Sequence, residues 1–108
     1  DKLGGHLVSG HVDCIAQLTE LHEDARSYRL GFKLSNNNYL KYIVKKGSIC
    51  VDGVSLTVNK ESDDSFFVNI IPFTWNNTIM QFYKLEAIVN IEVDRIALHV
   101  EKLLNNKG

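Results

Sequence analysis

Polar side chains gather in three short segments of this chain, and each segment also contains a Gly or Pro that leaves backbone groups open. The segments are residues 9–11 (Ser-Gly-His), 52–57 (Asp-Gly-Val-Ser-Leu-Thr) and 71–74 (Ile-Pro-Phe-Thr). Hydroxyl, imidazole and carboxylate groups can move protons, and open backbone amides can bind a flat polar ligand. Each segment alone is equally typical of an ordinary turn, but the three together indicate a ligand pocket.

Three other kinds of site fit the residues less well. His6, His11, Cys14 and Cys50 do not have the spacing of a zinc site. Ser55 lies in Gly-Val-Ser-Leu-Thr instead of the Gly-x-Ser-x-Gly of a serine hydrolase, and it follows a predicted hairpin. An oligonucleotide-binding groove needs a basic surface with exposed aromatic side chains, whereas 12 Lys and Arg balance 13 Asp and Glu here.

Length and charge narrow the class of protein. A chain of 108 residues predicts one domain with a core of its own. The net charge of −1 argues against nucleic acid or an anionic membrane as a partner, and no apolar run is long enough to span a bilayer. No signal peptide is recognisable, and the chain begins at Asp1 instead of Met, so we expect a fragment or an engineered chain. Its two cysteines form no Cys-x-x-Cys pair, which is typical of a reduced, cytoplasmic protein.

The first half of the chain predicts two strands and a short helix. Residues 12–21 are rich in apolar side chains, and residues 27–34 alternate between apolar and polar side chains, as a half-buried strand does. Residues 36–38 are three consecutive Asn, which favour a turn and a helix cap. Apolar residues at helical spacing follow from Tyr39, and Gly47 is a natural end for that helix.

The second half predicts a hairpin and two further strands. Residues 49–51 and 54–58 flank Asp52-Gly53, a strong signal for a tight turn. A strand over residues 66–71 ends at Pro72, which cannot donate to a ladder. Residues 88–93 alternate again and predict the last strand.

Two more helices complete the prediction. Residues 74–84 predict a short helix, and an apolar stripe from Ile96 to Leu104 predicts an amphipathic terminal helix and a frayed tail over residues 95–108. The predicted elements are about six strands with short connecting helices and no β-α-β alternation. We therefore expect an all-β fold, a small closed antiparallel barrel, as one domain over residues 1–108 whose first five residues, 1–5, are a linker. No internal repeat is evident in the sequence.

Four motifs occur in an order that resembles one family. Residues 4–13 (GGHLVSGHVD), 46–58 (KGSICVDGVSLTV), 70–72 (IIP) and 89–94 (VNIEVD) are similar to riboflavin synthases, and more narrowly to the second of their two tandem lumazine-binding domains. The resemblance extends from Leu3 to Leu104. It implies a six-stranded Greek-key barrel.

The resemblance also implies a reaction. Two molecules of 6,7-dimethyl-8-ribityllumazine react by transfer of a four-carbon unit, which gives riboflavin and a pyrimidinedione, without a metal or redox cofactor. The family's site lies between the first domain of one subunit and the second domain of a neighbour, in a homotrimer held partly by terminal helices. This fragment would bind one ring and need a partner domain for turnover. The alternative is a lumazine or flavin carrier with the same fold and no catalysis.

The resemblance assigns roles residue by residue. It makes Ser55 and Asp94 a proton-handling pair and adds His11 as a third catalytic candidate. The residues that it implies for substrate binding are Gly10, His11, Val12, Lys46, Ser55, Leu56, Thr57, Ile71, Pro72, Phe73, Thr74, Trp75 and Asn76. Four residues depart from the family pattern: Phe73 replaces the usual His or Glu, Gln81 and Glu86 replace turn glycines, and Cys14 replaces a small residue.

Overall fold

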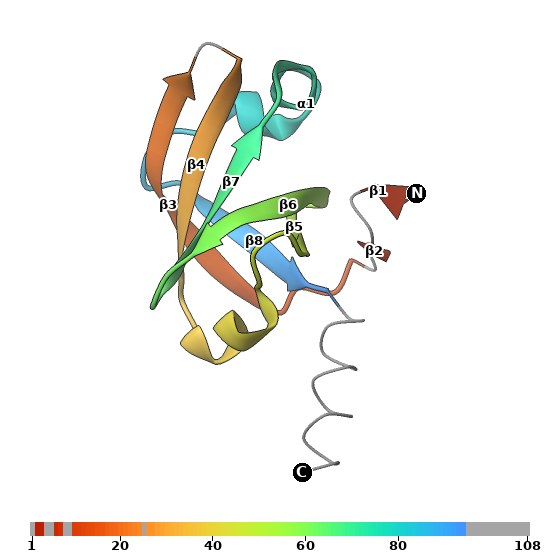
Figure 1. The fold of residues 1–108 in the computed structure, drawn as a ribbon, viewed down its shortest axis with the longest axis vertical. Helices are drawn as coiled ribbons and strands as arrows, with labels where there is room; N and C mark the ends of the chain where they lie inside the picture. Colours follow the sequence, from red (N-terminus) through yellow and green to blue (C-terminus); the bar gives the residue numbers. More distant parts are fainter. Residues whose placement is uncertain (1, 4–5, 8–9, 25, 95–108) are drawn as a thin grey trace.

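The chain folds into a closed antiparallel barrel of six strands (Figure 1). The computed structural model describes residues 2–3, 6–7, 10–24 and 26–94. The barrel order is β3-β4-β7-β6-β5-β8. The bounds are β3 (Cys14–Asp24), β4 (Ser27–Leu34), β5 (Ser48–Val51), β6 (Val54–Glu61), β7 (Ser65–Ile70) and β8 (Ile88–Val93). The predicted fold class is confirmed.

The helices in the connections between strands are shorter than the sequence predicts. The helix expected from Tyr39 is a 3-10 helix, η1 (Asn37–Tyr42), capped by the side chain of Asn36. The helix predicted over residues 74–84 is wrong as a single element, because it is split into α1 (Pro72–Asn76) and η2 (Ile79–Phe82). The split occurs where Asn77 ends α1 and the hydroxyl of Thr78 accepts a hydrogen bond from the Met80 amide, which starts η2.

Side chains that point into the barrel form one hydrophobic core. Phe32 and Phe66 stack at its centre with ring centroids 5.2 Å apart, and Met80 from η2 is fully buried against them. Alternation along each strand supplies the other core residues, because successive side chains point to opposite faces. Those on the three strands nearest the predicted site are Ile49, Val51, Leu56, Val58, Val89, Ile91 and Val93.

The two halves of the barrel repeat one hydrogen-bonding pattern 40 positions apart. The first half is residues 14–51 and the second is residues 54–93. The amide of Lys46 in the first half donates to the Val58 carbonyl in the second, and the amide of Glu86 in the second half donates to the Leu18 carbonyl in the first. The next residues repeat a second bond: the Gly47 carbonyl accepts from the Val58 amide, and the Ala87 carbonyl accepts from the Leu18 amide. Lys46 and Glu86 both have positive φ, of 71° and 76°. A register shift also follows Val58 in β6 and Leu18 in β3.

One further pair of strands lies outside this barrel. Lys2–Leu3 (β1) and His6–Leu7 (β2) form an antiparallel pair within and beyond the segment predicted as a linker. The amphipathic helix predicted over residues 95–108 lies outside the described residues. Within the described part of the chain, no helix is long and apolar enough to cross a membrane.

Candidate functional site

Neighbouring strands β6 and β7 pair along only part of their length. Their ladder runs from Val58–Val68 to Glu61–Phe66, and none of its rungs joins residues 54–57 to β7. The equivalent strands of the first half, β3 and β4, stay paired at the matching place, through Gln17–Lys33 and Ala16–Leu34. Figure 1 shows β6 and β7 separating toward the end where β7 leads into α1. We call this unpaired stretch the open seam; its strand edges leave backbone amides and carbonyls to bind something other than the opposite strand.

Lys46 and Thr57 meet beside the apex of the open seam. Together with Asn59 and Asn69 they line a depression of about 210 Å³. The positive φ of Lys46 and the bond from its amide to Val58 fix the backbone next to Thr57. The sequence therefore predicted two residues that the structure brings together. Their ammonium and hydroxyl groups can donate to the carbonyl or ring nitrogen of a flat ligand.

Ser55 lies at a position where its hydroxyl is buried without a partner. It stands opposite Cys50, which stands opposite Glu92 on β8. Because Leu56, Ile49 and Val93 point into the core, this row points to the outside of the barrel. Cys50 and Glu92 are nevertheless buried. The Oγ atom of Ser55 is also buried and has no hydrogen-bond partner in the described structure.

Electrostatics make the Cys50 thiol a poor nucleophile. Burial raises its pKa, the Glu92 and Asp52 carboxylates raise it further, and a backbone hydrogen bond from Gly53 lowers it in part. A thiol that stays protonated is unreactive. In this row the proton-handling candidates are therefore the Ser55 hydroxyl and the Glu92 carboxylate.

Asp94 follows β8 directly, and it is partly buried. The register of Ile49 with Val93 places Asp94 beside Ser48, which stands opposite Thr57. Asp94 and Ser55 thus lie in adjacent outward rows, on two strands that β5 separates. At roughly 4.8 Å per strand spacing, their backbones are about 10 Å apart across the sheet. A ligand atom or a water molecule between them would be needed to link the two side chains.

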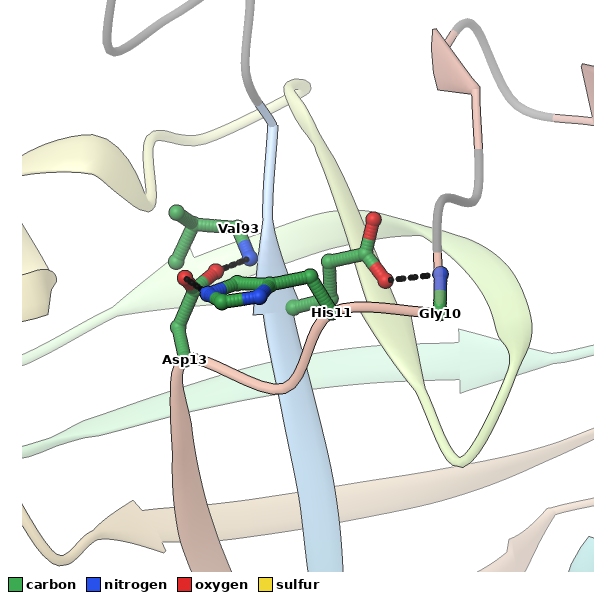
Figure 2. A network of polar contacts seen from close by, with 5 residues as sticks. Gly10, His11, Asp13 and Val93 are labelled. Atoms are coloured by element: carbon green, nitrogen blue, oxygen red, sulfur yellow. Dashed lines mark hydrogen bonds and ion pairs between the residues drawn. The ribbon is translucent and has the colours of Figure 1, made fainter.

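The segment that carries Gly10, His11 and Val12 is fastened to β8 (Figure 2). The Val93 amide donates to Oδ2 of Asp13 at 2.8 Å, and the Gly10 amide donates to Oε1 of Glu92 at 3.2 Å. Nε2 of His11 lies 3.8 Å from Oδ1 of Asp13, whose side chain is only 3% exposed. His11 itself is 70% exposed. The imidazole is therefore oriented by a buried carboxylate and remains accessible to a ligand or partner.

Gly10 and Val12 belong to a second depression, of about 370 Å³, on the outside of β5 and β8. It is also lined by Cys50, Glu92 and Asp52. Asp52 has a structural role there: its carboxylate accepts hydrogen bonds from the Asn90 amide and the Tyr83 hydroxyl. The predicted site residues are therefore divided between two depressions, with the row of Ser55, Cys50 and Glu92 between them.

Ile71 and then α1 follow the open seam. Pro72 occupies the first turn, where its missing amide costs nothing. The ring of Trp75 stacks on Tyr28 of β4 with centroids 4.0 Å apart, which fixes α1 on that strand. Ile71 and Phe73 are 59% and 73% exposed, while Thr74 is partly buried and Asn76 exposed. These residues present an apolar edge that can cover a flat ligand.

Three polar residues near the site were missed by sequence reasoning. Asn59 and Asn69 line the depression beside Thr57, and Glu92 is buried in the row of Ser55. Asn69 lies on a predicted strand and Asn59 directly follows one, and nothing in their spacing marks them. Glu92 occupies an outward position of its strand, yet it is buried and accepts a hydrogen bond from the Gly10 amide. Within the described ranges, no group of three or more His, Cys, Asp or Glu residues could hold a metal ion.

Comparison with known proteins identifies the family. Residues 9–94 match the model of the lumazine binding domain. The chain is 41% identical over 105 residues to the riboflavin synthase of Saccharomyces cerevisiae, covering 94% of this chain and 44% of that protein. It is 41% identical to the riboflavin synthase of Photobacterium phosphoreum, covering 95% and 47%. It is 39% identical to that of Escherichia coli, covering 87% and 44%. The chain thus spans about half the length of these relatives.

Two solved structures have the same barrel. A structure of LumP complexed with 6,7-dimethyl-8-(1'-D-ribityl) lumazine gives a TM-score of 0.77 at 20% identity, covering 86% of this chain and 52% of LumP. A structure of LumP complexed with riboflavin gives 0.77 at 22% identity, covering 86% and 50%. At this identity the likeness concerns the fold. The family match over residues 9–94, together with the barrel, leads to one conclusion: the chain belongs to the lumazine-binding domain family.

Proposed function

We propose that this chain is the second lumazine-binding domain of a riboflavin synthase, a transferase that makes riboflavin and a pyrimidinedione from two molecules of 6,7-dimethyl-8-ribityllumazine. The observation that carries the proposal is the open seam, which is unpaired in β6–β7 and closed in β3–β4. Beside it lie a lysine, a threonine and a buried serine hydroxyl that has no partner in the described structure. A flat heterocycle that inserts there would bond to strand edges and to these side chains together.

The chemistry asks for positioning more than for a strong base. The C7 methyl group of the lumazine is acidic, because the ring delocalises the resulting anion. The main task is to hold two rings face to face, and such positioning can lower a barrier by roughly 7–11 kcal/mol. Ser55 and Asp94 would exchange protons with one ring. His11, whose imidazole Asp13 orients, would be a third group for proton transfer. Thr57, Lys46 and the backbone next to Leu56 would orient that ring.

The half-length match supports a need for a partner domain. A chain that spans about half of its relatives supplies one domain. The second ring would come from the first domain of a neighbouring subunit in a homotrimer, in the cytoplasm, with no metal or redox cofactor. The isolated chain would bind a ring without turning it over.

A binding and turnover experiment tests the proposal. Riboflavin fluorescence should be quenched on titration with the 108-residue chain, whereas 6,7-dimethyl-8-ribityllumazine incubated with the chain should yield almost no riboflavin. Steady turnover by the chain alone would contradict the need for a partner domain. Absence of any riboflavin or lumazine binding would contradict the proposed site.

Variants of the longer protein separate enzyme from carrier. Asp94→Asn should lower turnover more than it weakens lumazine binding, because an amide keeps the shape of the carboxylate but cannot accept its proton. Ser55→Ala should lower turnover by about 10²-fold, the lower range for acid–base groups. Tight lumazine binding by the unmutated longer protein without riboflavin formation would favour a non-catalytic carrier instead.

A further inference from the structure

Glu92 is a buried carboxylate on the outer face of the barrel. Its neighbours Ile91 and Val93 point into the core, so Glu92 points outward, yet it is only 4% exposed. Its backbone is fixed, because β8 pairs with β5 on one side and with β3 on the other. A carboxylate that leaves water is costly to the fold unless other hydrogen bonds replace the lost ones. The burial of Glu92 therefore points to a partner that needs this group.

The partner is the backbone at Gly10. The Gly10 amide donates to Oε1 of Glu92 at 3.2 Å, and the two residues are 82 positions apart. Gly10 has a φ of 83°, in the left-handed region that glycine adopts without strain. A hydrogen bond to a charged acceptor is stronger than one to a neutral acceptor. Glu92 therefore holds Gly10 more firmly than a neutral side chain would.

Asp13 fastens the other end of the same segment. Its amide donates to the Ile91 carbonyl at 2.8 Å, and its Oδ2 accepts from the Val93 amide at 2.8 Å. Both bonds join Asp13 to β8, the strand that carries Glu92 (Figure 2). We call residues 10–13, which are fixed to β8 at both ends, the clamped segment.

His11 lies inside the clamped segment. From Gly10 to Asp13 the chain has three peptide units, which span at most about 11 Å. With both ends fixed, the backbone of His11 has little room to move. Nε2 of His11 lies 3.8 Å from Oδ1 of Asp13, which is longer than a hydrogen bond. That contact orients the ring without fixing the backbone that carries it.

The two ends of the clamped segment differ in what else holds them. Asp13 runs directly into β3, whose ladder with β8 begins at Cys14, so its position does not depend on Glu92. Gly10 lies four positions before β3, and its bond to Glu92 ties the chain to β8 on the N-terminal side of His11. Glu92 therefore supplies the anchor that the ladder does not.

We propose that Glu92 is a positioning residue: it holds the clamped segment against β8 and thereby keeps His11 in place for proton transfer with the ring. This inference rests on the proposed function, because His11 has a catalytic role only there. With Oε1 engaged at Gly10, Glu92 acts through the backbone and not on the ring. The resemblance to riboflavin synthases assigned no role to this residue.

Hydrogen exchange measures the clamp in the 108-residue chain. Glu92→Ala should speed exchange of the Gly10 amide about 10- to 150-fold, the factor for loss of a hydrogen bond to a charged group. Glu92→Gln keeps the size of the side chain and an oxygen that accepts the bond, so it should lose only part of the protection. It provides the same comparison if Glu92→Ala does not fold. Glu61→Ala, which removes an exposed glutamate at the end of β6, is the matched control and should leave exchange at Gly10 unchanged.

Turnover of the longer protein measures whether the clamp acts through His11. Glu92→Ala should lower kcat by up to about 10²-fold, the effect of misplacing a reacting group by roughly 1 Å. Glu92→Gln should retain more of the activity, and Glu61→Ala all of it. In a protein that already carries His11→Ala, Glu92→Ala should lower kcat no further, because the group that it positions is gone.

The outcomes separate the two proposals. Equal losses of kcat from Glu92→Ala with and without His11→Ala would overturn the positioning role, and so would unchanged exchange at Gly10. If the unmutated longer protein makes no riboflavin, the proposed function fails, and the catalytic role of the clamped segment fails with it. Faster exchange at Gly10, together with a loss of kcat that disappears in the His11→Ala background, would support the proposal.

Discussion

Ser55→Ala should make the isolated domain more stable while it weakens ligand binding. The Oγ atom of Ser55 is buried and has no hydrogen-bond partner in the described structure. A buried hydroxyl in that state costs the fold about 1–3 kcal/mol, because it has lost its bonds to water. Alanine removes the hydroxyl and leaves the methylene carbon in place. Part of this cost should therefore be recovered.

The expected gain is about 1 kcal/mol in the free energy of unfolding. For a domain close to 100 residues, 1 kcal/mol raises the melting temperature by about 4–8 °C. Circular dichroism during a thermal ramp would measure this shift. Thr57→Val is the matched control, because it removes an exposed hydroxyl from the same strand and should change stability by no more than about 0.5 kcal/mol.

Riboflavin titration of the same variants completes the experiment. If the ligand satisfies the Ser55 hydroxyl, Ser55→Ala should raise the dissociation constant about 2- to 12-fold. Opposite signs for stability and affinity are typical of residues kept for function. A melting temperature that falls in Ser55→Ala would refute the reasoning, since it would show that the hydroxyl already stabilises the ligand-free fold.

Three further predictions concern the barrel itself. Gly31→Ala should destabilise the domain by about 1–3 kcal/mol in urea, because a Cβ there would lie 2.6 Å from the Phe67 ring; Phe67→Leu should reduce this penalty, and an unchanged penalty would contradict the clash. Burial, and then the hydrogen bond to Asp52, raise the pKa of Tyr83 above its ordinary 10.0. The protonated Tyr83 therefore makes its full contribution to the free energy of unfolding below pH 10, and this contribution is lost as the pH rises further. Tyr83→Phe should lose that part of the pH dependence in urea titrations at pH 9 and 11, and identical slopes would count against it. Burial, followed by the charge of Asp13, raises the pKa of Cys14 from 9.0 to about 11, so its thiolate fraction at pH 8 should be roughly 100-fold lower than that of an unshifted thiol. Iodoacetamide should label Cys14 quickly only in urea, and fast labelling of the native chain would oppose this.

Much of the barrel was predictable because local signals agree with it. The alternation over Ser27–Leu34 and Ile88–Val93 gave both strands their observed bounds. Asp52 and Gly53 both have positive φ, of 48° and 84°, as a tight hairpin turn requires. The prediction of one helix over residues 74–84 was wrong, because the spacing of apolar residues carries no information about local capping. The side chain of Thr78 begins a new turn there, and that bond interrupts the helix.

The candidate site was predictable only where a motif carries it. Lys46 and Thr57 were expected together and lie together. The separation of β6 from β7 depends on long-range pairing, which no local pattern encodes. For the same reason, register places Asn59 and Asn69 beside Thr57, and Glu92 bonds to a residue 82 positions earlier.

The repeated halves of the barrel exchange their last strands, and this has a consequence for how the chain folds. β5 of the first half pairs with β6, and β8 of the second half pairs with β3. The final strand of each half forms its backbone hydrogen bonds with strands of the other half. Folding therefore requires contacts between distant parts of the chain and should be slow and all-or-none. A chain cleaved at the Asp52-Gly53 turn should yield two pieces that are unfolded when separate and that form the barrel only when mixed.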